Sequence, residues 1–360
     1  MNRYSKRIDS LQGFRMLLFL FIFVSHTGMF AGMKETAAFE HLFGWGGVMG
    51  TCVFFVLSGF IVGIHGDSDT SATLLSVVRK RVRQVYPYHI FFLLITVPIY
   101  VREIVAEPMT SLIKFVVNAM LIQSWIPSMS YALSYNGVSW FLSTLMFLTI
   151  FQVPLCFLSV KIESQKACLQ IYGLIVVGCC ILPWILAYLV QENVRYWLYI
   201  FPPIRLLDYI AGFCCGRIYG MHRPVTGTGA CNISATLKEG MVLISIFVCL
   251  CLSSFIPIAY SRQALYLWIA VLSVYIFAKQ EGKIAMFFAR DKMVRLGSAC
   301  LYYMMSHQVI IRYMAGVLNK LSCMHPLLYS AAALLITIYT EPLFDSFLLP
   351  RIKKFMKWSM

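Results

Sequence analysis

The segment QGFRMLLFLFIFVSHTG, residues 12–28, indicates what kind of protein this chain forms. A transmembrane helix needs about 20 predominantly apolar residues, and this segment supplies most of one. Arg15 and His26 bracket the apolar run. Ionisable side chains are costly within a membrane, and those that lie there usually mark a functional site. The segment therefore predicts a membrane-spanning helix that carries part of a site.

The remainder of the chain has the same character. Of its 360 residues, 60% are hydrophobic and 12% are charged, whereas about a quarter of the residues in soluble domains are charged. No stretch of mixed polarity is long enough to bury a core of its own. We predict an all-α polytopic membrane protein, with one integral-membrane domain over residues 1–360 and no appended soluble domain. The twelve cysteines show no metal-ligand spacing, so we expect no bound metal.

Apolar runs recur from end to end, and ten of them are long enough to predict membrane-spanning helices. These predicted spans are at about 12–31, 46–65, 86–101, 138–159, 168–190, 200–219, 240–258, 263–278, 296–316 and 326–349.

One further apolar segment, SLIKFVVNAMLIQSWIP at 111–127, is short and carries Lys114, Asn118 and Gln123. Cytoplasmic loops collect Lys and Arg, and most of the 30 basic residues share one side only if this segment does not cross. We therefore predict both termini in the cytoplasm and a re-entrant or interfacial helix at 111–127 on the outer side. The net charge of +15 then belongs to a cytoplasmic collar, and we expect no nucleic-acid partner.

Several ionisable residues are predicted to lie at a similar depth in the membrane. At 1.5 Å of rise per residue, His26, His307 and Asp208 fall roughly 17–20 Å from the inner face. Arg205 lies one helical turn from Asp208 on the same face. Such a group is typical of a functional cavity. The simpler alternatives are a histidine that bonds to a neighbouring helix, a structural Arg205–Asp208 ion pair, and a topological anchor at Arg15.

Six motifs follow one another along the chain. The first is RIDSLQGFRMLLFLFIFVSH, in which ten residues separate Arg15 from His26. The others are GVMGTCVFFVLSGFIV with Ser58, RKRVRQVYPYHI, VSWFLSTLMFL with Trp140, VRLGSACLYYMMSHQVII with His307, and YTEPLF with Glu341. In this order they resemble the membrane acyltransferase-3 family, bacterial integral-membrane enzymes that acylate cell-surface sugars and some small molecules. No motif is specific alone, but six in order make a strong signal.

One position departs from the family pattern. Many members carry a glutamate five residues after the tryptophan of the fourth motif, where this chain has Leu145. The resemblance therefore assigns no catalytic carboxylate to this predicted span.

The resemblance implies acyl transfer from cytoplasmic acyl-CoA, most often acetyl-CoA, to a hydroxyl of a cell-surface polysaccharide, glycolipid or related acceptor. It also implies a multi-pass protein of the bacterial inner membrane, surrounded by lipid, with acyl-CoA as donor substrate and no bound cofactor. His26 is the candidate general base or covalent acyl carrier, because histidine exchanges protons near neutral pH. His307 or Asp208 is expected to orient it, as a third group does in other acyl-transfer sites.

The remaining candidate residues fall into two groups. Arg15, Arg79, Arg81 and Arg83 are predicted to bind the phosphates of CoA, because a guanidinium group can bind two oxygens at once. The alternative for the arginines at 79–83 is a topological anchor. Acceptor-binding or structural roles are predicted for Ser58, Trp140, Arg205 and Glu341.

Two non-enzymatic classes remain as alternatives. A proton-coupled transporter can use His26, Asp208 and His307 as a proton relay. However, the two halves of the chain show no convincing internal repeat of the kind common in transporters. A ligand sensor can keep the same fold without catalysis, and the intact pair of Arg15 and His26 argues against that alternative.

Overall fold

The computed structural model describes residues 7–30, 44–65, 73–162, 164–190, 192–222, 232–262, 264–320 and 325–356. Regular structure in these ranges is helical throughout. The predicted all-α class is therefore confirmed for the described part of the chain.

Each predicted span corresponds to one helix or to a bent pair of helices. These helices are α1 (Asp9–His26), α2 (Gly46–His65), α3 (Leu74–Thr96), α7 (Trp140–Ile150), α8 (Gln152–Lys161), α9 (Gln165–Leu189), α10 (Pro202–Met221), α11 (Ile233–Leu252), α13 (Ala264–Ala278), α16 (Cys300–Leu318), α17 (Pro326–Leu343) and α18 (Leu349–Phe355). Short helices connect them: α4 (Val101–Ala106), α5 (Pro108–Ala119), α6 (Met129–Ala132), α12 (Ile258–Ser261), α14 (Lys283–Phe288) and α15 (Asp291–Ser298).

Seven of the described helices are long and apolar enough to cross a bilayer, or up to eight if the bent pair α7–α8 counts as one span. That pair bends by 43° where the helix breaks at Phe151. The chain therefore has the composition of a membrane protein with several spanning helices. The count of ten spans and the cytoplasmic position of both termini stay predictions.

Two helices begin earlier than the apolar runs predict. α3 begins at Leu74 rather than near 86, because the hydroxyl of Thr73 accepts a backbone N–H of the first turn. α11 is displaced toward the N-terminus relative to the predicted 240–258, and Asn232 caps it in the same way. Hydropathy detects only the apolar part of a helix, whereas a capping side chain determines the residue at which the helix starts. The basic run 79–83 is therefore helical, not a loop.

The segment 111–127 does not form one continuous helix. α5 contains 12 residues and is about 18 Å long, too short to cross about 30 Å of hydrocarbon. Two of its polar side chains are buried and hydrogen-bonded: Asn118 Nδ2 donates to Ser134 Oγ at 2.7 Å, and Gln123 Nε2 donates to Ser139 Oγ at 3.1 Å. These bonds hold the segment against residues 128–139, in agreement with a segment that does not cross.

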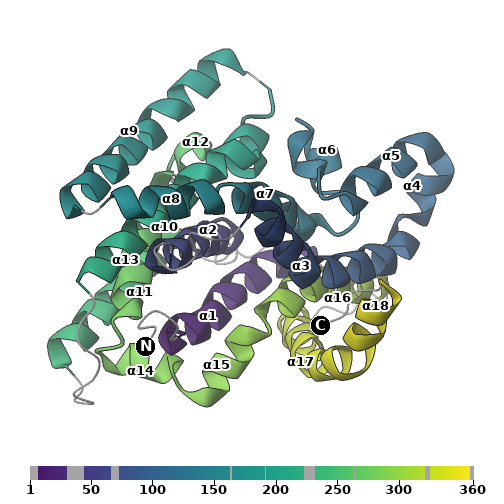
Figure 1. The fold of residues 1–360 in the computed structure, drawn as a ribbon. Helices are drawn as coiled ribbons and strands as arrows, with labels where there is room; N and C mark the ends of the chain where they lie inside the picture. Colours follow the sequence, from purple (N-terminus) through teal and green to yellow (C-terminus); the bar gives the residue numbers. More distant parts are fainter. Residues whose placement is uncertain are drawn as a thin grey trace.

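The helices α1, α2 and α10 form the centre of the molecule, and later helices surround them (Figure 1). In their most apolar stretches, 78% of α2 and 72% of the helix that includes α10 are buried, against 17% for α9 and for α17. The outer helices thus expose apolar side chains that suit lipid, while α2 and α10 are shielded from it.

Glycines bring α2 and α10 into direct backbone contact. A Cβ at Gly59 would overlap the carbonyl oxygen of Tyr209, and a Cβ at Gly212 would overlap that of Val56. Small residues at such contacts are the usual means of close helix packing in membranes, where no hydrophobic force drives helices together. This contact fixes the central pair against which α1 packs.

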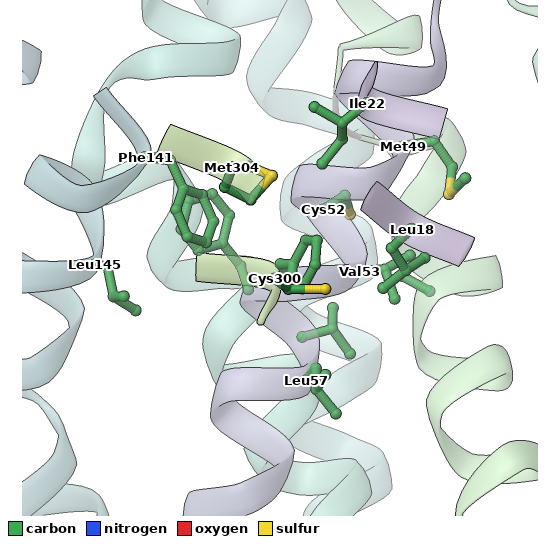
Figure 2. Packing of buried hydrophobic residues seen from close by; sticks show 14 of the residues in the cluster. Leu18, Ile22, Met49, Cys52, Val53, Leu57, Phe141, Leu145, Cys300 and Met304 are labelled. Carbon is green, nitrogen blue, oxygen red and sulfur yellow. The ribbon is translucent and has the colours of Figure 1, made fainter. Parts of the chain in front are cut away.

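α1 lies along α2 with interdigitating apolar side chains. Leu18 and Ile22 of α1 lie near Met49, Cys52 and Val53 of α2 (Figure 2), and all five side chains are buried. The packing places the C-terminal end of α1 beside the start of α2, which is where the site is found.

Candidate active site

A cavity of about 310 Å³ lies at the C-terminal end of α1. Its wall combines the end of α1, the middle of α16, the starts of α2 and α7, and connecting segments that are distant in sequence. Polar and aromatic side chains that line it include His26, Trp140, Tyr199, Arg262, Gln308 and Arg312. The volume is typical of a small-molecule site.

His26 and His307 meet at this cavity although 281 residues separate them. His307 Nε2 lies 3.4 Å from His26 Nδ1, and the two ring centroids are 5.0 Å apart in an edge-on arrangement. His307 is fully buried behind His26, against the ring of Phe19. The structure therefore brings together the predicted base and one of its two predicted orienting partners.

Backbone carbonyls determine which ring nitrogens of this pair carry protons. His26 Nδ1 lies 2.8 Å from the carbonyl oxygen of Ile22, and His307 Nδ1 lies 2.8 Å from that of Tyr303. A carbonyl oxygen only accepts, so both Nδ1 atoms are donors when the rings are neutral. His307 Nε2 then presents its lone pair to His26 Nδ1–H. His26 Nε2 is left with a free lone pair on a ring that lines the cavity, which is the arrangement a general base needs.

Two further residues of α16 line the cavity beside the histidine pair. Gln308 directly follows His307, and its Oε1 is buried without a hydrogen-bond partner in the described part of the chain. Arg312 lies one turn further on, where its Nη1 donates to Tyr100 Oη and to the carbonyl oxygen of Tyr135, both at 2.7 Å. These bonds fix a positive charge near His26.

The opposite wall is aromatic and also basic. Trp140 packs on Tyr199, with ring centroids 4.8 Å apart. The guanidinium of Arg262 lies 4.5 Å from the centroid of the Trp45 ring and 5.8 Å from that of Tyr199. Such cation–π contacts hold an arginine without using its hydrogen-bond donors.

A second cavity, of about 300 Å³, lies at the other end of α1 and is lined by Arg15. Arg15 Nη1 donates to Gln12 Oε1 at 3.2 Å. The remaining lining comes mainly from the first turns of α1 and the last turns of α2, including His65. The two predicted functional residues of α1 therefore face two cavities, about 16 Å apart along the helix axis.

The helical form of 79–83 divides its three arginines. Arg81 is half-buried, and its charge acts on Arg15. Arg79 and Arg83 are exposed, because residues two apart point to opposite faces of a helix, whereas residues four apart share a face. Their predicted role at CoA phosphates stays a prediction, and Arg81 is the one that lies near Arg15.

Asp208 does not line the cavity of His26. It binds Arg205 Nη1 at 2.7 Å, and both side chains are fully buried. Arg205 also donates to the carbonyl oxygens of Tyr199, Leu198 and Arg262, at 2.8, 2.8 and 3.1 Å. This geometry favours the structural ion pair: it joins α10 to the two segments that carry the cavity residues Tyr199 and Arg262.

Three other positions named from the sequence lie away from the histidines. Ser58 donates to the carbonyl oxygen of Phe54 within α2, at 2.8 Å, and Glu341 lines a separate polar pocket with Arg295. Leu145 is buried in the apolar cluster of Figure 2 and does not line the cavity. The residue that stands in place of the family's glutamate is thus part of the core.

Sequence reasoning missed several lining residues: Arg195, Arg262, Gln308 and Arg312. Arg312 could have been identified from the sequence, since it is an ionisable residue near the end of the predicted span 296–316. The other two arginines lie between predicted spans, where a basic residue has no distinctive meaning.

The sequence of the chain is similar to those of known proteins. The sequence profile of a family described as acyltransferase domain, of the acyltransferase-3 type, matches residues 8–341. The chain is also similar to the acyltransferase MdmB of Streptomyces mycarofaciens, with 24% identity over 323 residues that cover 85% of this chain and 80% of the relative. No solved structure matches. Because the profile covers nearly the whole chain, including both histidines and both cavities, this protein belongs to the acyltransferase-3 family of membrane acyltransferases.

Proposed function

We propose that the protein moves an acyl group, acetyl in the simplest case, from acyl-CoA to a hydroxyl of a cell-surface polysaccharide, glycolipid or related acceptor. The observation that carries this proposal is that His26 lines one cavity with His307 in contact behind it, and that Arg15 lines a second cavity on the same helix. One helix thus connects an anion-binding group to a base.

His26 Nε2 is the proposed base. As the acceptor oxygen bonds to the acyl carbon and the carbon–sulfur bond breaks, the hydroxyl proton moves to Nε2, and it is then available to the departing CoA thiolate. His26 Nδ1–H keeps its bonds to the Ile22 carbonyl and His307 throughout. These acceptors stabilise the positive imidazolium that forms, as the third group does in other acyl-transfer sites.

A covalent route uses the same atom. In that version Nε2 attacks the thioester, an acyl-His26 forms as CoA leaves, and the acceptor hydroxyl then takes the acyl group. The two routes share the geometry and differ in whether an acylated enzyme accumulates in the absence of acceptor.

The donor is proposed to bind at the Arg15 cavity. Arg15 and Arg81 supply guanidinium groups for CoA phosphates, and the roughly 16 Å between Arg15 and His26 is a distance that an extended pantetheine arm can span. This assignment puts the N-terminal end of α1 at the cytoplasmic face of a bacterial inner membrane, where acyl-CoA is made, and the His26 cavity toward the outside.

The test combines a purified enzyme with intact cells. The purified full chain, given acetyl-CoA and an extract of envelope glycans, is expected to release free CoA thiol and to label the glycans with acetyl groups. Mass spectrometry of surface glycans from cells with and without the protein should show a lost acetyl mass. Thiol release without any labelled glycan would refute the glycan acceptor, and no thiol release would refute the acyl-CoA donor.

A further inference from the structure

The cavity beside His26 carries an excess of positive charge. Arg195, Arg262 and Arg312 line it and come from three separate segments of the chain. Among the described residues that line it there is no aspartate or glutamate. The carboxylate of Asp208 does not line the cavity and is bound to Arg205. A cavity of one sign concentrates ligands of the opposite charge.

Arg262 is held in place with unused donors. Its backbone carbonyl accepts from Arg205 Nη2 at 3.1 Å, and its side chain lies over Trp45. Its Nε is buried and has no hydrogen-bond partner in the described part of the chain. Burial lowers the pKa of Arg262 to about 10, which leaves it positive at neutral pH. A buried donor without a partner is unfavourable, so a bound acceptor group would relieve it.

The guanidinium group of Arg312 also has N–H donors beyond those that make its two hydrogen bonds. Within the described residues, its side-chain hydrogen bonds are made by Nη1, to Tyr100 and Tyr135. A guanidinium group has five N–H donors in a planar fork, which suits the paired oxygens of a phosphate or carboxylate. The same side chain lines the cavity that contains His26.

We propose that the acceptor carries an oxyanion, a phosphate or a carboxylate, which Arg262 and Arg312 bind while Arg195 attracts it at the rim. The inference rests on the proposed function only in assigning this cavity to the acceptor. An anion held there also balances positive charge when His26 takes up the hydroxyl proton. A neutral acceptor offers no such balance.

Ligand-induced stabilisation of the purified full chain tests the proposal without requiring activity, because a ligand that binds only the folded state raises its Tm. The probes are glucose, glucose 6-phosphate and glucuronate, which share a sugar and differ in charge. Both anionic probes are expected to raise the Tm and glucose is not. A response to only one of them would identify the anion as phosphate or as carboxylate.

Variants locate the binding site. Arg262→Gln and Arg312→Gln should each weaken binding of the anionic probe by about tenfold or more, the effect expected from losing a hydrogen bond between charged groups. Arg102→Gln is the matched control, because Arg102 is exposed and does not line the cavity. An increase in Tm that survives in both cavity variants would reflect general screening of the positive protein and would overturn the proposal, as would an equal response to glucose.

The His26→Gln variant separates this inference from the proposed function. It should keep the response to anions while losing acyl transfer. If anions bind through Arg262 and Arg312 but no variant or wild-type protein transfers an acyl group, the anion site stands and the acyltransferase mechanism fails. If transfer is normal and anions give no response, the mechanism stands and the anionic acceptor is refuted.

Discussion

At the scale of single residues, the paired histidines are the feature that most constrains mechanism. His26 and His307 both donate Nδ1–H to a carbonyl of their own helix, which orients each ring before any substrate binds. Preorganisation of this kind places the free nitrogen of His26 at the cavity without reorganisation during the reaction. Two substitutions test the roles of the two rings separately.

His26→Gln and His26→Ala are each expected to lower acyl transfer by about 10²–10⁴-fold, because neither side chain can take the hydroxyl proton. Protein levels and acyl-CoA binding should be retained, measured by gel filtration and by equilibrium binding of labelled acyl-CoA. His222→Gln is the matched control: His222 makes the same Nδ1 contact to the carbonyl four residues earlier and is exposed at the end of α10. Near-normal transfer by His26→Gln would show that His26 is a packing residue.

His307 is proposed to position His26, and His307→Phe removes its acceptor nitrogen while keeping a ring. Transfer should fall by roughly 3- to 10-fold, the equivalent of one net hydrogen bond. In a His26→Gln background the same substitution should have no further effect, because residues that act as a unit are not additive. Equal fractional losses in both backgrounds would mean that His307 acts independently of His26.

At the scale of secondary-structure elements, helical periodicity decides which side chains of a motif reach the site. The basic run of α3 places Arg81 toward Arg15 and leaves Arg79 and Arg83 exposed. The glycines of α2 and α10 permit a backbone contact that larger residues would prevent. In the first case the position within the helix decides which of three like residues approaches Arg15, and in the second the contact requires glycine at defined positions.

Arg81→Gln should raise the KM for acyl-CoA more than Arg79→Gln or Arg83→Gln, since Arg81 is half-buried and its charge acts on Arg15, whereas Arg79 and Arg83 are exposed. Steady-state kinetics with the purified enzyme at fixed acceptor measure the difference, and the kcat should change little. Equal effects of all three substitutions would favour diffuse attraction of CoA phosphates by the whole basic run. An unchanged KM in all three would leave these arginines with a topological role only.

Gly212→Ala is expected to destabilise the protein by about 1–3 kcal/mol, because its Cβ would overlap the Val56 carbonyl oxygen and α2 would have to move. Gly220→Ala, on the same helix, meets no atom within 4 Å and should be neutral or slightly stabilising, since Ala favours helix more than Gly does. Thermal unfolding in detergent compares the two. A similar Tm for both variants would contradict the close packing of α2 and α10.

At the scale of the whole molecule, two cavities lie at the two ends of the central helices. The Arg15 cavity is at the N-terminal end of α1, and the His26 cavity is at its C-terminal end. The surrounding helices expose large apolar side chains, such as Trp184 and Leu327, which suit contact with lipid. In the proposed function, the donor and the acceptor reach these two cavities from opposite sides of a membrane.

The distribution of Lys and Arg predicts the topology of the chain in the membrane. A reporter fused to the C-terminus should be in the cytoplasm, and a reporter inserted between α4 and α5 should be on the opposite face, because Lys and Arg collect on the cytoplasmic side. Protease protection of right-side-out and inverted vesicles distinguishes the two faces. A C-terminal reporter accessible from outside would refute the topology with both ends inside, and with it the cytoplasmic position of the Arg15 cavity.

Much of the fold followed from the sequence because apolar length and residue identity are local properties. The runs around α2 and α13 predicted those helices within a residue, and the two residues singled out on the first helix, Arg15 and His26, each line a cavity. Helix starts at Thr73 and Asn232 were missed because capping side chains lie outside the apolar runs. The estimated depths in the membrane predicted that Asp208 lies beside the histidines. That prediction was wrong because a depth does not show which way a side chain faces.

The sequence by itself determined that this chain is helical and belongs in a membrane, because the length and hydropathy of an apolar run are properties of one short segment. Only the tertiary structure decided that His307 contacts His26, that Asp208 is bound by Arg205 instead, and that Arg262 and Arg312 face the same cavity. Those pairings depend on how helices rotate and approach one another, and close contacts such as that of Gly212 with Val56 set the rotation. The relative rotation of two helices that are distant in sequence depends on their packing against each other, so a pattern within one helix does not predict it.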